Sequence, residues 1–192
     1  MTIRLRYLGF KWRALALLVF GRQRLALGVF DRMLSEFPGD EYALSSKGHL
    51  LAQLGQKRPA AEAYRALVVA FPDNARHWFN HGYLLEQLDD YPGAEEAFRR
   101  ATELSPKLDR AWYGLGLVLI RLQRFDEAVV ALKKNTQLQP MSPYGWYQLA
   151  RVHVDRHEPE EALRIIRHLK RFEPKVAAQL ERETGIMVPP AS

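Results

Sequence analysis

The residues with the clearest chemical potential in this sequence are two pairs of histidines. His77 and His81 are four residues apart, and so are His153 and His157. On a helix this spacing places both imidazoles on one face, where they could hold a zinc ion with a third ligand. No carboxylate beside either pair completes a zinc motif, and the chain has no cysteine. We therefore predict no metal site and no cofactor, and interpret the histidines as packing or solvated side chains.

Motifs for catalysis are equally scarce. The sequence contains no glycine-rich phosphate loop, no G-x-S-x-G elbow and no Cys-His arrangement. Paired carboxylates occur where second helices are expected to begin, and there they suit the positive end of a helix. They are Glu95, Glu96, Asp126, Glu127, Glu160 and Glu161. We predict that the chain is not an enzyme.

The elements that position these side chains must come from an ordinary folded chain. The protein has 192 residues, of which 47% are hydrophobic, and this composition argues against disorder. The absence of cysteine suits a reducing compartment, so we expect a cytoplasmic protein. The formal net charge is +6. All of it arises in residues 1–30, whose basic residues have no acidic neighbours: Arg4, Arg6, Lys11, Arg13, Arg22 and Arg24.

The same N-terminal segment superficially resembles a secretory signal. Its uncharged run extends only from Ala14 to Gly21, whereas a helix that spans a bilayer needs about 20 apolar residues. No small-x-small cleavage site follows closely. We expect this segment to be mature, non-spanning structure.

Prolines recur with a fixed period. Pro38, Pro72, Pro106, Pro140 and Pro174 are each 34 residues apart. If proline is position 32 of a unit, position 20 is always alanine, namely Ala26, Ala60, Ala94, Ala128 and Ala162. Position 8 is always small, namely Ala14, Gly48, Gly82, Gly116 and Ala150. Positions 4 and 24 are large and apolar in every unit.

These columns predict two antiparallel helices in each unit. Positions 4, 8 and 11 lie one turn apart on a first helix, and positions 20, 24 and 27 do so on a second. Small residues at positions 8 and 20 let the helices approach, and we expect bulky residues at positions 4 and 24 to fill the space between neighbouring units. Proline at position 32 ends the second helix.

The chain resembles a tetratricopeptide repeat (TPR) protein. The family pattern W-x2-L-G-x2-Y is nearly complete in "WYGLGLVL" from Trp112 to Leu119, where Leu119 replaces tyrosine. The resemblance covers residues 7–176 and implies an all-α, right-handed superhelical solenoid. We expect one domain over residues 1–176, a capping helix at 177–185 and a flexible tail at 186–192. The five predicted repeats are 7–40, 41–74, 75–108, 109–142 and 143–176.

In this family the first helices line a concave groove that holds a peptide or a partner segment. Positions 2, 5, 6, 9, 12 and 13 of each repeat would face it, and in repeat five these positions include Tyr144 and Gln148. The groove residues that we single out are Tyr42, His49, Arg76, Phe79, Asn80, Tyr83, Arg110, Tyr113, Arg121, Tyr147 and Arg151. This wall is rich in tyrosine and arginine, which dominate binding hot spots. An acidic or carboxylate-ended peptide would suit it. The alternative is that the tyrosines only pack between helices and the arginines are solvated.

One more specific partner is disfavoured. Some family members clamp the C-terminal carboxylate of chaperones with five residues from successive repeats. These are Lys and Asn four residues apart in one repeat, Asn in the next repeat, and then Lys and Arg four residues apart. The matching positions here are Ser45, His49, Asn80, Arg110 and Gly114. Only two of these five residues suit the clamp.

Repeat one has an apolar wall instead. Leu8, Trp12, Leu15 and Val19, which we name the N-terminal stripe, lie within a narrow arc of one helix. Such a stripe is typical of a contact with a partner, a membrane surface or a second copy of the chain, or it is covered by residues 1–6. The sequence leaves these alternatives open.

Two functional hypotheses follow. The favoured one is a non-catalytic protein-interaction scaffold or adaptor that uses its groove. The other is a membrane-peripheral assembly factor anchored through the basic, apolar N-terminal helix. RNA binding is disfavoured because residues 31–192 carry 22 basic and 22 acidic residues, once the six basic residues of 1–30 are set aside.

Overall fold

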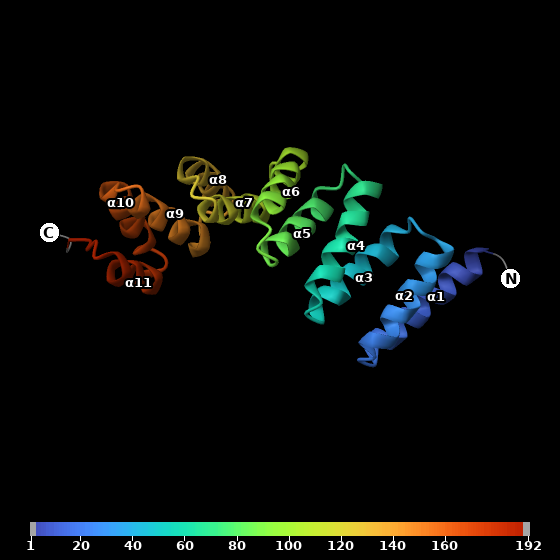
Figure 1. Cartoon of the computed structure of the whole chain (residues 1–192). Helices are drawn as coiled ribbons and strands as arrows, with labels where there is room; N and C mark the ends of the chain where they lie inside the picture. The colour runs from blue at the N-terminus through green and yellow to red at the C-terminus, as the bar shows by residue number, and fades with distance from the viewer. Residues whose placement is uncertain (1–2, 190–192) are drawn as a thin grey trace. The chain divides into compact units, whose positions relative to one another are not determined.

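The period of 34 residues produces helices throughout the chain. The computed structural model describes residues 3–189, and within them it contains eleven α-helices and no strand (Figure 1). The helices are α1 (Ile3–Val19), α2 (Gln23–Glu36), α3 (Glu41–Gln53), α4 (Lys57–Ala70), α5 (Ala75–Glu86), α6 (Tyr91–Leu104), α7 (Asp109–Arg121), α8 (Phe125–Leu138), α9 (Pro143–Asp155), α10 (Pro159–Leu169) and α11 (Pro174–Thr184). The repeated prolines act as expected, because α2, α4, α6 and α8 each end two residues before one of them.

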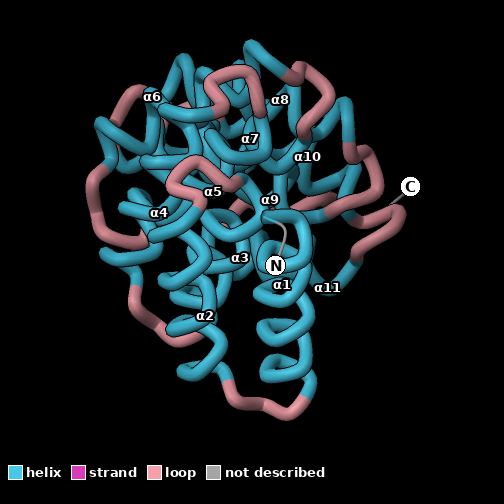
Figure 2. The backbone as a smooth tube through the Cα atoms, turned by 90° about the vertical axis from the view of Figure 1, so that its right-hand side faces the viewer, coloured by secondary structure: helices cyan, strands magenta, loops and turns pink. Residues whose placement is uncertain are grey.

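The chain divides into two compact units. Unit 1 ends at Asp90 and holds α1 to α5, and unit 2 begins at Tyr91 and holds α6 to α11. Within each unit every helix packs on the next one in the chain, and α11 also packs on α9. In unit 1, α1 and α2 run side by side, joined by a short loop (Figure 2). The predicted all-α stack of helix pairs is confirmed. The single solenoid domain stays a prediction.

The turn inside each repeat requires one residue with a left-handed backbone. Position 15 has φ of 69° at Gly21, 75° at Gly55, 61° at Asp89, 58° at Gln123 and 59° at His157. Glycine adopts this conformation without strain, whereas other residues pay for the approach of Cβ to the backbone. The first helix therefore ends two or three residues before this turn in every repeat.

Tryptophan at position 4 fastens the start of a repeat to the proline before it. The indole N–H of Trp78 donates to the carbonyl oxygen of Pro72 at 2.7 Å. Trp112 does the same to Pro106 at 2.9 Å, and Trp146 to Pro140 at 2.9 Å. The tryptophans at position 4 and the prolines that precede them are thus the donors and acceptors of one recurring hydrogen bond. This bond helps to fix the direction in which the first helix of the next repeat begins.

Small residues in the first helices leave room for bulky ones in the second helices. A Cβ added at Gly48 would lie 2.9 Å from the Tyr64 ring, and one at Gly116 would lie 2.7 Å from Leu132. The expectation that position 24 fills the space between units is incomplete, since Tyr64 and Leu132 also fill the space at position 8 of their own repeat. Phe98 does pack as expected, against Gly114 of the following repeat. A side chain at position 24 therefore lies between the two helices of its own repeat and can also contact the first helix of the next repeat.

The last helix closes unit 2. It begins at Pro174, three residues before the expected start, and Gly185 follows it with φ of 72°, a left-handed stop. Its Glu181 carboxylate accepts a hydrogen bond from the backbone N–H of Val188 at 2.8 Å and pairs with Lys170 Nζ at 2.8 Å. The described part of the predicted tail, 186–189, therefore lies against α11, and residues 190–192 are outside the described residues.

Candidate peptide-binding groove

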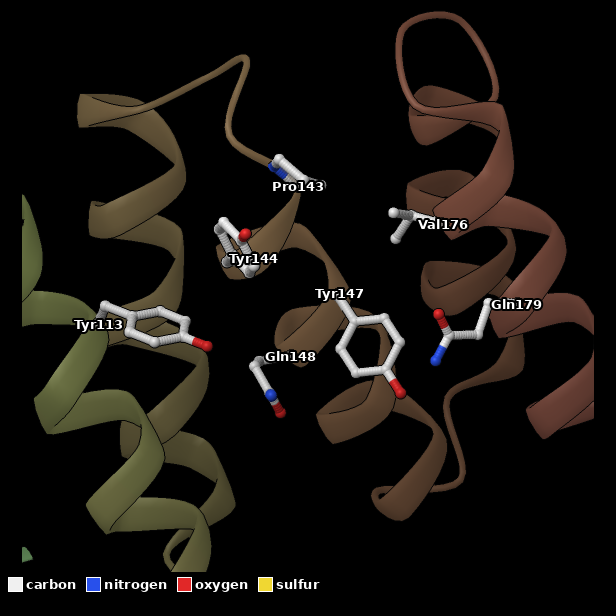
Figure 3. Close-up of a pocket in the computed structure, with 7 residues that line it drawn as sticks. All are labelled: Tyr113, Pro143, Tyr144, Tyr147, Gln148, Val176 and Gln179. Atoms are coloured by element: carbon white, nitrogen blue, oxygen red, sulfur yellow. The ribbon is translucent and has the colours of Figure 1, made fainter. Parts of the chain in front are cut away.

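Three aromatic side chains of unit 2 lie together on the first helices of two repeats. Tyr113 comes from α7, and Tyr144 and Tyr147 come from α9. They line a cavity of about 290 Å³ together with Pro143, Gln148, Val176 and Gln179 (Figure 3). The helical spacing explains the cluster, because Tyr144, Tyr147 and Gln148 are three and four residues apart on one face of α9.

A second, larger cavity adjoins the first. Its volume is about 640 Å³, and it shares Tyr113 and Tyr144 with the first cavity. Its other lining residues are Asp109, Arg110, Asn135, Gln139 and Ser142. The buried Asn135 is held in place because its side-chain amide donates to the backbone carbonyl of Asp109 at 2.9 Å. We call the two cavities together the unit 2 groove.

Helix α11 supplies one wall of this groove, which the sequence reasoning missed. Val176 and Gln179 line the smaller cavity. The next helical turn carries Glu183, which accepts hydrogen bonds from the Tyr147 hydroxyl at 2.5 Å and from the Gln179 amide at 2.8 Å. Gln179 and Glu183 lie beyond the last repeat, and Val176 is its final residue, so the period gave no groove positions for α11. Its one available signal was that residues 176, 179 and 183 fall at helical spacing.

The hydrogen bond between Tyr147 and Glu183 changes the acidity of both groups. Donation to a carboxylate favours the neutral phenol, so the pKa of Tyr147 is raised, with burial as a further cause. The pKa of the Glu183 carboxyl is lowered, first by Tyr147 and then by Gln179, with Arg151 adding a smaller contribution. At neutral pH Tyr147 is therefore a hydrogen-bond donor and Glu183 is an anion.

Positive charge lies close to the aromatic wall. The Arg151 guanidinium carbon is 5.9 Å from the centre of the Tyr147 ring, within the range of a cation–π contact. Arg110 lines the larger cavity, and Arg121 is exposed in the last turn of α7. Helix α11 brings the Glu183 carboxylate close to Tyr147 and Arg151, so this end of the groove carries a negative charge as well as positive ones.

The predicted groove residues of unit 1 lie in a different setting. Tyr42 packs edge-on against Phe30 with ring centres 6.1 Å apart, and Lys11 Nζ lies 4.2 Å from the centre of its ring. Tyr42 is therefore partly a packing residue, in line with the alternative interpretation. The other predicted groove residues are exposed or half-buried: His49, Arg76, Phe79, Asn80 and Tyr83. Their contact with a ligand stays a prediction, as does that of the unit 2 residues.

The N-terminal stripe lies on the surface of unit 1. Trp12 is 69% exposed and Val19 is 74% exposed, and Leu8 and Leu15 are also exposed. The proposal that residues 1–6 cover the stripe is wrong for residues 3–6, because these residues form the first turn of α1 itself. Residues 1 and 2 are outside the described residues.

Neither pair of histidines forms a metal site in the described chain. His77 is buried, and its Nε2 lies 2.8 Å from a Glu41 carboxylate oxygen. His153 is buried as well, with Nδ1 2.6 Å from Glu158. His157 follows the end of α9 at the left-handed turn, so it does not share a helix face with His153. Within residues 3–189 no group of three or more His, Asp or Glu side chains could hold a metal ion.

No helix within the described residues is long and apolar enough to cross a membrane. Helix α1, which holds the apolar run near the N-terminus, has 17 residues, fewer than a membrane-spanning helix needs. It also contains four basic side chains: Arg4, Arg6, Lys11 and Arg13.

Comparisons with known structures identify many chains with a similar fold. The crystal structure of MamA protein is 19% identical in sequence with a TM-score of 0.83, covering 96% of this chain and 98% of that one. YrrB, described as a TPR protein with an unusual peptide-binding site, is 19% identical with a TM-score of 0.79, covering 88% of each chain. MamA 41-end from Desulfovibrio magneticus RS-1 is 20% identical with a TM-score of 0.78, covering 92% of this chain and 96% of that one.

Sequence comparisons agree on the family. No curated protein sequence matches the chain. Two models of the tetratricopeptide repeat do match it, one over residues 46–109 and the other over residues 85–146. Together these matches span more than half of the chain and include the whole of α4 to α8. The chain belongs to the tetratricopeptide repeat family.

Proposed function

We propose that the protein is a non-catalytic interaction scaffold whose unit 2 groove binds an extended peptide segment of a partner protein. The observation that carries this proposal is the meeting of Tyr113, Tyr144 and Tyr147 around one cavity. Tyrosine offers a large, rigid apolar face with a polar tip, and it loses little conformational entropy on binding. Tyr144 is 70% exposed, so much of its face is accessible to a ligand.

The polar side chains around the tyrosines suit a peptide backbone. The Gln148 amide can pair with the N–H and C=O groups of an extended chain, and the Gln179 carbonyl oxygen can accept from a peptide N–H while its amide donates to Glu183. The smaller cavity has room for a side chain between the aromatic faces. A peptide with an apolar or proline residue at this point would combine stacking with backbone hydrogen bonds.

The larger cavity favours an acidic residue next to that anchor. Arg110 lines this cavity and can form a bidentate pair with a ligand carboxylate. Asp109 lines it as well, so a basic ligand residue beside that carboxylate would also find a partner. We therefore propose a ligand with a carboxylate near its apolar anchor. YrrB, which has the same fold, is described as having a peptide-binding site, and this supports a peptide as the class of ligand.

A third cavity of unit 2 is a weaker candidate. It has a volume of about 430 Å³ and lies among charged side chains. Those side chains already pair with one another, since Arg124 contacts Glu127 at 2.7 Å and Arg156 contacts Glu158 at 2.9 Å and Asp126 at 3.0 Å. A ligand would have to break these pairs, so we place the binding site in the unit 2 groove.

Selection from a random-sequence peptide library displayed on phage tests this proposal. We expect selected peptides to share an apolar or proline residue with an Asp or Glu nearby. The variant Tyr113→Ala/Tyr144→Ala should fail to retain them, and Arg110→Glu should weaken binding by about tenfold at low salt. Arg65→Glu, an exposed residue of α4 outside the predicted groove positions, is the matched charge control. Equal retention by wild-type and the double tyrosine variant, with unchanged circular dichroism, would contradict the proposal.

A further inference from the structure

Helix α1 has two apolar faces, of which only one is used inside unit 1. The inner face packs against α2 through the buried Ala14 and the half-buried Phe10, Leu17 and Leu18. The outer face carries the N-terminal stripe, and Leu5, which is 57% exposed, extends the stripe toward the start of the helix. With about 3.6 residues per turn, these outer residues fall within roughly 80° around the helix axis.

Two more large apolar side chains are exposed past the end of α1. Phe20 is 78% exposed and Leu25 is 58% exposed, and they flank the turn between α1 and α2. Single exposed apolar residues are common, but a line of large ones along a whole helix is typical of a contact surface. Because the inner face of α1 packs on α2, the stripe runs along the outside of unit 1. The helix can therefore lie with its long axis parallel to a surface that contacts the stripe.

Basic side chains surround this surface. The helical spacing places Arg4 on one side of the stripe and Arg13 on the other, and both are exposed. Arg22 and Arg24 are exposed at the turn beside Phe20 and Leu25. No acidic residue occurs in residues 1–30. The other two basic residues are engaged within unit 1, as Arg6 pairs with Glu36 at 2.7 Å and Lys11 lies over Tyr42.

We infer that this face of α1 docks on an anionic lipid surface, with the helix lying in the plane of the interface. An apolar stripe with tryptophan and leucine, bordered by arginines and free of acid, is complementary to acyl chains beneath negative headgroups. Trp12 at the centre suits the boundary between headgroups and acyl chains, since its ring is apolar and its N–H is polar. The helix lies on the membrane, because its basic residues and length are incompatible with crossing it.

A second copy of the chain suits this face less well. Pairing two stripes would bring Arg4, Arg13, Arg22 and Arg24 of both copies together without an acidic partner from residues 1–30. Repulsion among these groups would oppose the contact, whereas phosphatidylserine neutralises them. The inference does not depend on the unit 2 groove, so either proposal can fail without the other.

Co-sedimentation of the full chain with vesicles tests the inference. One vesicle preparation is phosphatidylcholine alone, and the other contains about one third phosphatidylserine. We expect binding only to the anionic vesicles, with at least a tenfold loss of affinity in Trp12→Ser/Leu15→Ser and a similar loss in Arg4→Gln/Arg13→Gln. The matched controls are Val69→Ser/Val130→Ser, which removes two exposed valines elsewhere, and Arg32→Gln/Arg65→Gln, which removes two exposed arginines elsewhere. Both controls should bind like wild-type.

Sedimentation velocity without lipid and thermal melting complete the test. We expect Trp12→Ser/Leu15→Ser to melt like wild-type and to have the same mass, because the substituted side chains are exposed. The inference is overturned if the wild-type chain does not bind anionic vesicles. It is also overturned if the stripe variant binds them unchanged, or if that variant loses self-association while its vesicle binding stays the same.

Discussion

Tyr147 on α9 donates its hydroxyl to the Glu183 carboxylate on α11 at 2.5 Å. This hydrogen bond joins the last repeat to α11, and its donor Tyr147 lines the unit 2 groove. It also places an anion beside Arg151, whose guanidinium lies over the same tyrosine ring. The groove is therefore less positive at this end than its arginines alone would make it.

We predict that Glu183→Gln strengthens binding of an acidic peptide selected on the wild-type groove. Removal of the anion leaves Arg151 without its nearby counter-charge, and an exposed charge of this kind alters affinity by about two- to fivefold. Fluorescence anisotropy with a labelled peptide at low and high salt measures the change. Glu160→Gln, an exposed carboxylate in the first turn of α10, is the matched control and should leave affinity unchanged. Weaker binding by Glu183→Gln would show that the carboxylate itself contacts the peptide.

We predict that unit 2 loses stability in acid partly through Glu181. Its pKa is lowered from 4.5 because Lys170 and the Val188 N–H hydrogen-bond to the charged carboxylate. A lowered pKa in the folded state contributes stability above the unfolded pKa, and this contribution is lost as the pH falls through the folded pKa. Glu181→Gln should therefore melt below wild-type at pH 7, and the two melting temperatures should converge as the pH falls below the ordinary range of a glutamate and through the lowered pKa of Glu181. Melts that differ equally at every pH would show that the charge of Glu181 is not the cause.

We predict that Gly116→Ala destabilises the protein although alanine is the better helix former. The added Cβ would lie 2.7 Å from Leu132, which is fully buried, so α7 and α8 must move apart. Overpacking of this kind costs about 1–3 kcal/mol. Gly28→Ala on α2 is the control, because nothing lies within 4 Å of its added Cβ. That control should raise stability by roughly 0.5–1 kcal/mol, and urea unfolding of both variants measures the contrast. A Gly116→Ala variant as stable as Gly28→Ala would mean that the pair α7 and α8 is not tightly packed.

We predict opposite effects from two substitutions at position 15. Gly55→Ala should destabilise the chain by about 1 kcal/mol, because alanine is strained at a φ of 75°. Gln123→Gly should relieve the same strain in another repeat and raise the free energy of unfolding by up to about 1 kcal/mol. Chemical denaturation of the two variants against wild-type measures both effects. A shift of both variants in the same direction would contradict the account that position 15 requires a left-handed backbone in each repeat.

Much of the fold followed from the period of the sequence. Alanine at position 20, small residues at position 8 and proline at position 32 predict helix pairs, and the structure places ten helices in that pattern within the described residues. The left-handed turn was not predicted, because Asp89, Gln123 and His157 do not signal a positive φ as Gly21 and Gly55 do. The indole hydrogen bonds were not predicted either. Each joins a tryptophan to the backbone carbonyl of a proline on the other side of a loop, and the residue types alone do not indicate such a contact.

The candidate site was only partly accessible to sequence reasoning. The resemblance to tetratricopeptide repeats assigned Tyr113, Tyr147 and Gln148 to groove positions, and the structure brings them together around one cavity. The contribution of α11 depends on how that helix packs on α9 after the last repeat, which no repeated pattern records. Tyr42 is a mixed case, because its position suggested the groove and its half-buried ring also packs against Phe30.

The most direct test of a peptide-binding unit 2 groove is photo-cross-linking from within it. Replacement of Tyr144 by a photoreactive phenylalanine analogue puts the probe on a side chain that is 70% exposed beside Tyr113 and Tyr147. The same analogue at Val130, which is 66% exposed on α8, is the control. Under illumination with a selected acidic peptide, we predict an adduct at position 144, absent at 130 and suppressed by excess unlabelled peptide. Equal adducts at both positions, or an adduct at 144 that excess peptide does not reduce, would contradict the account.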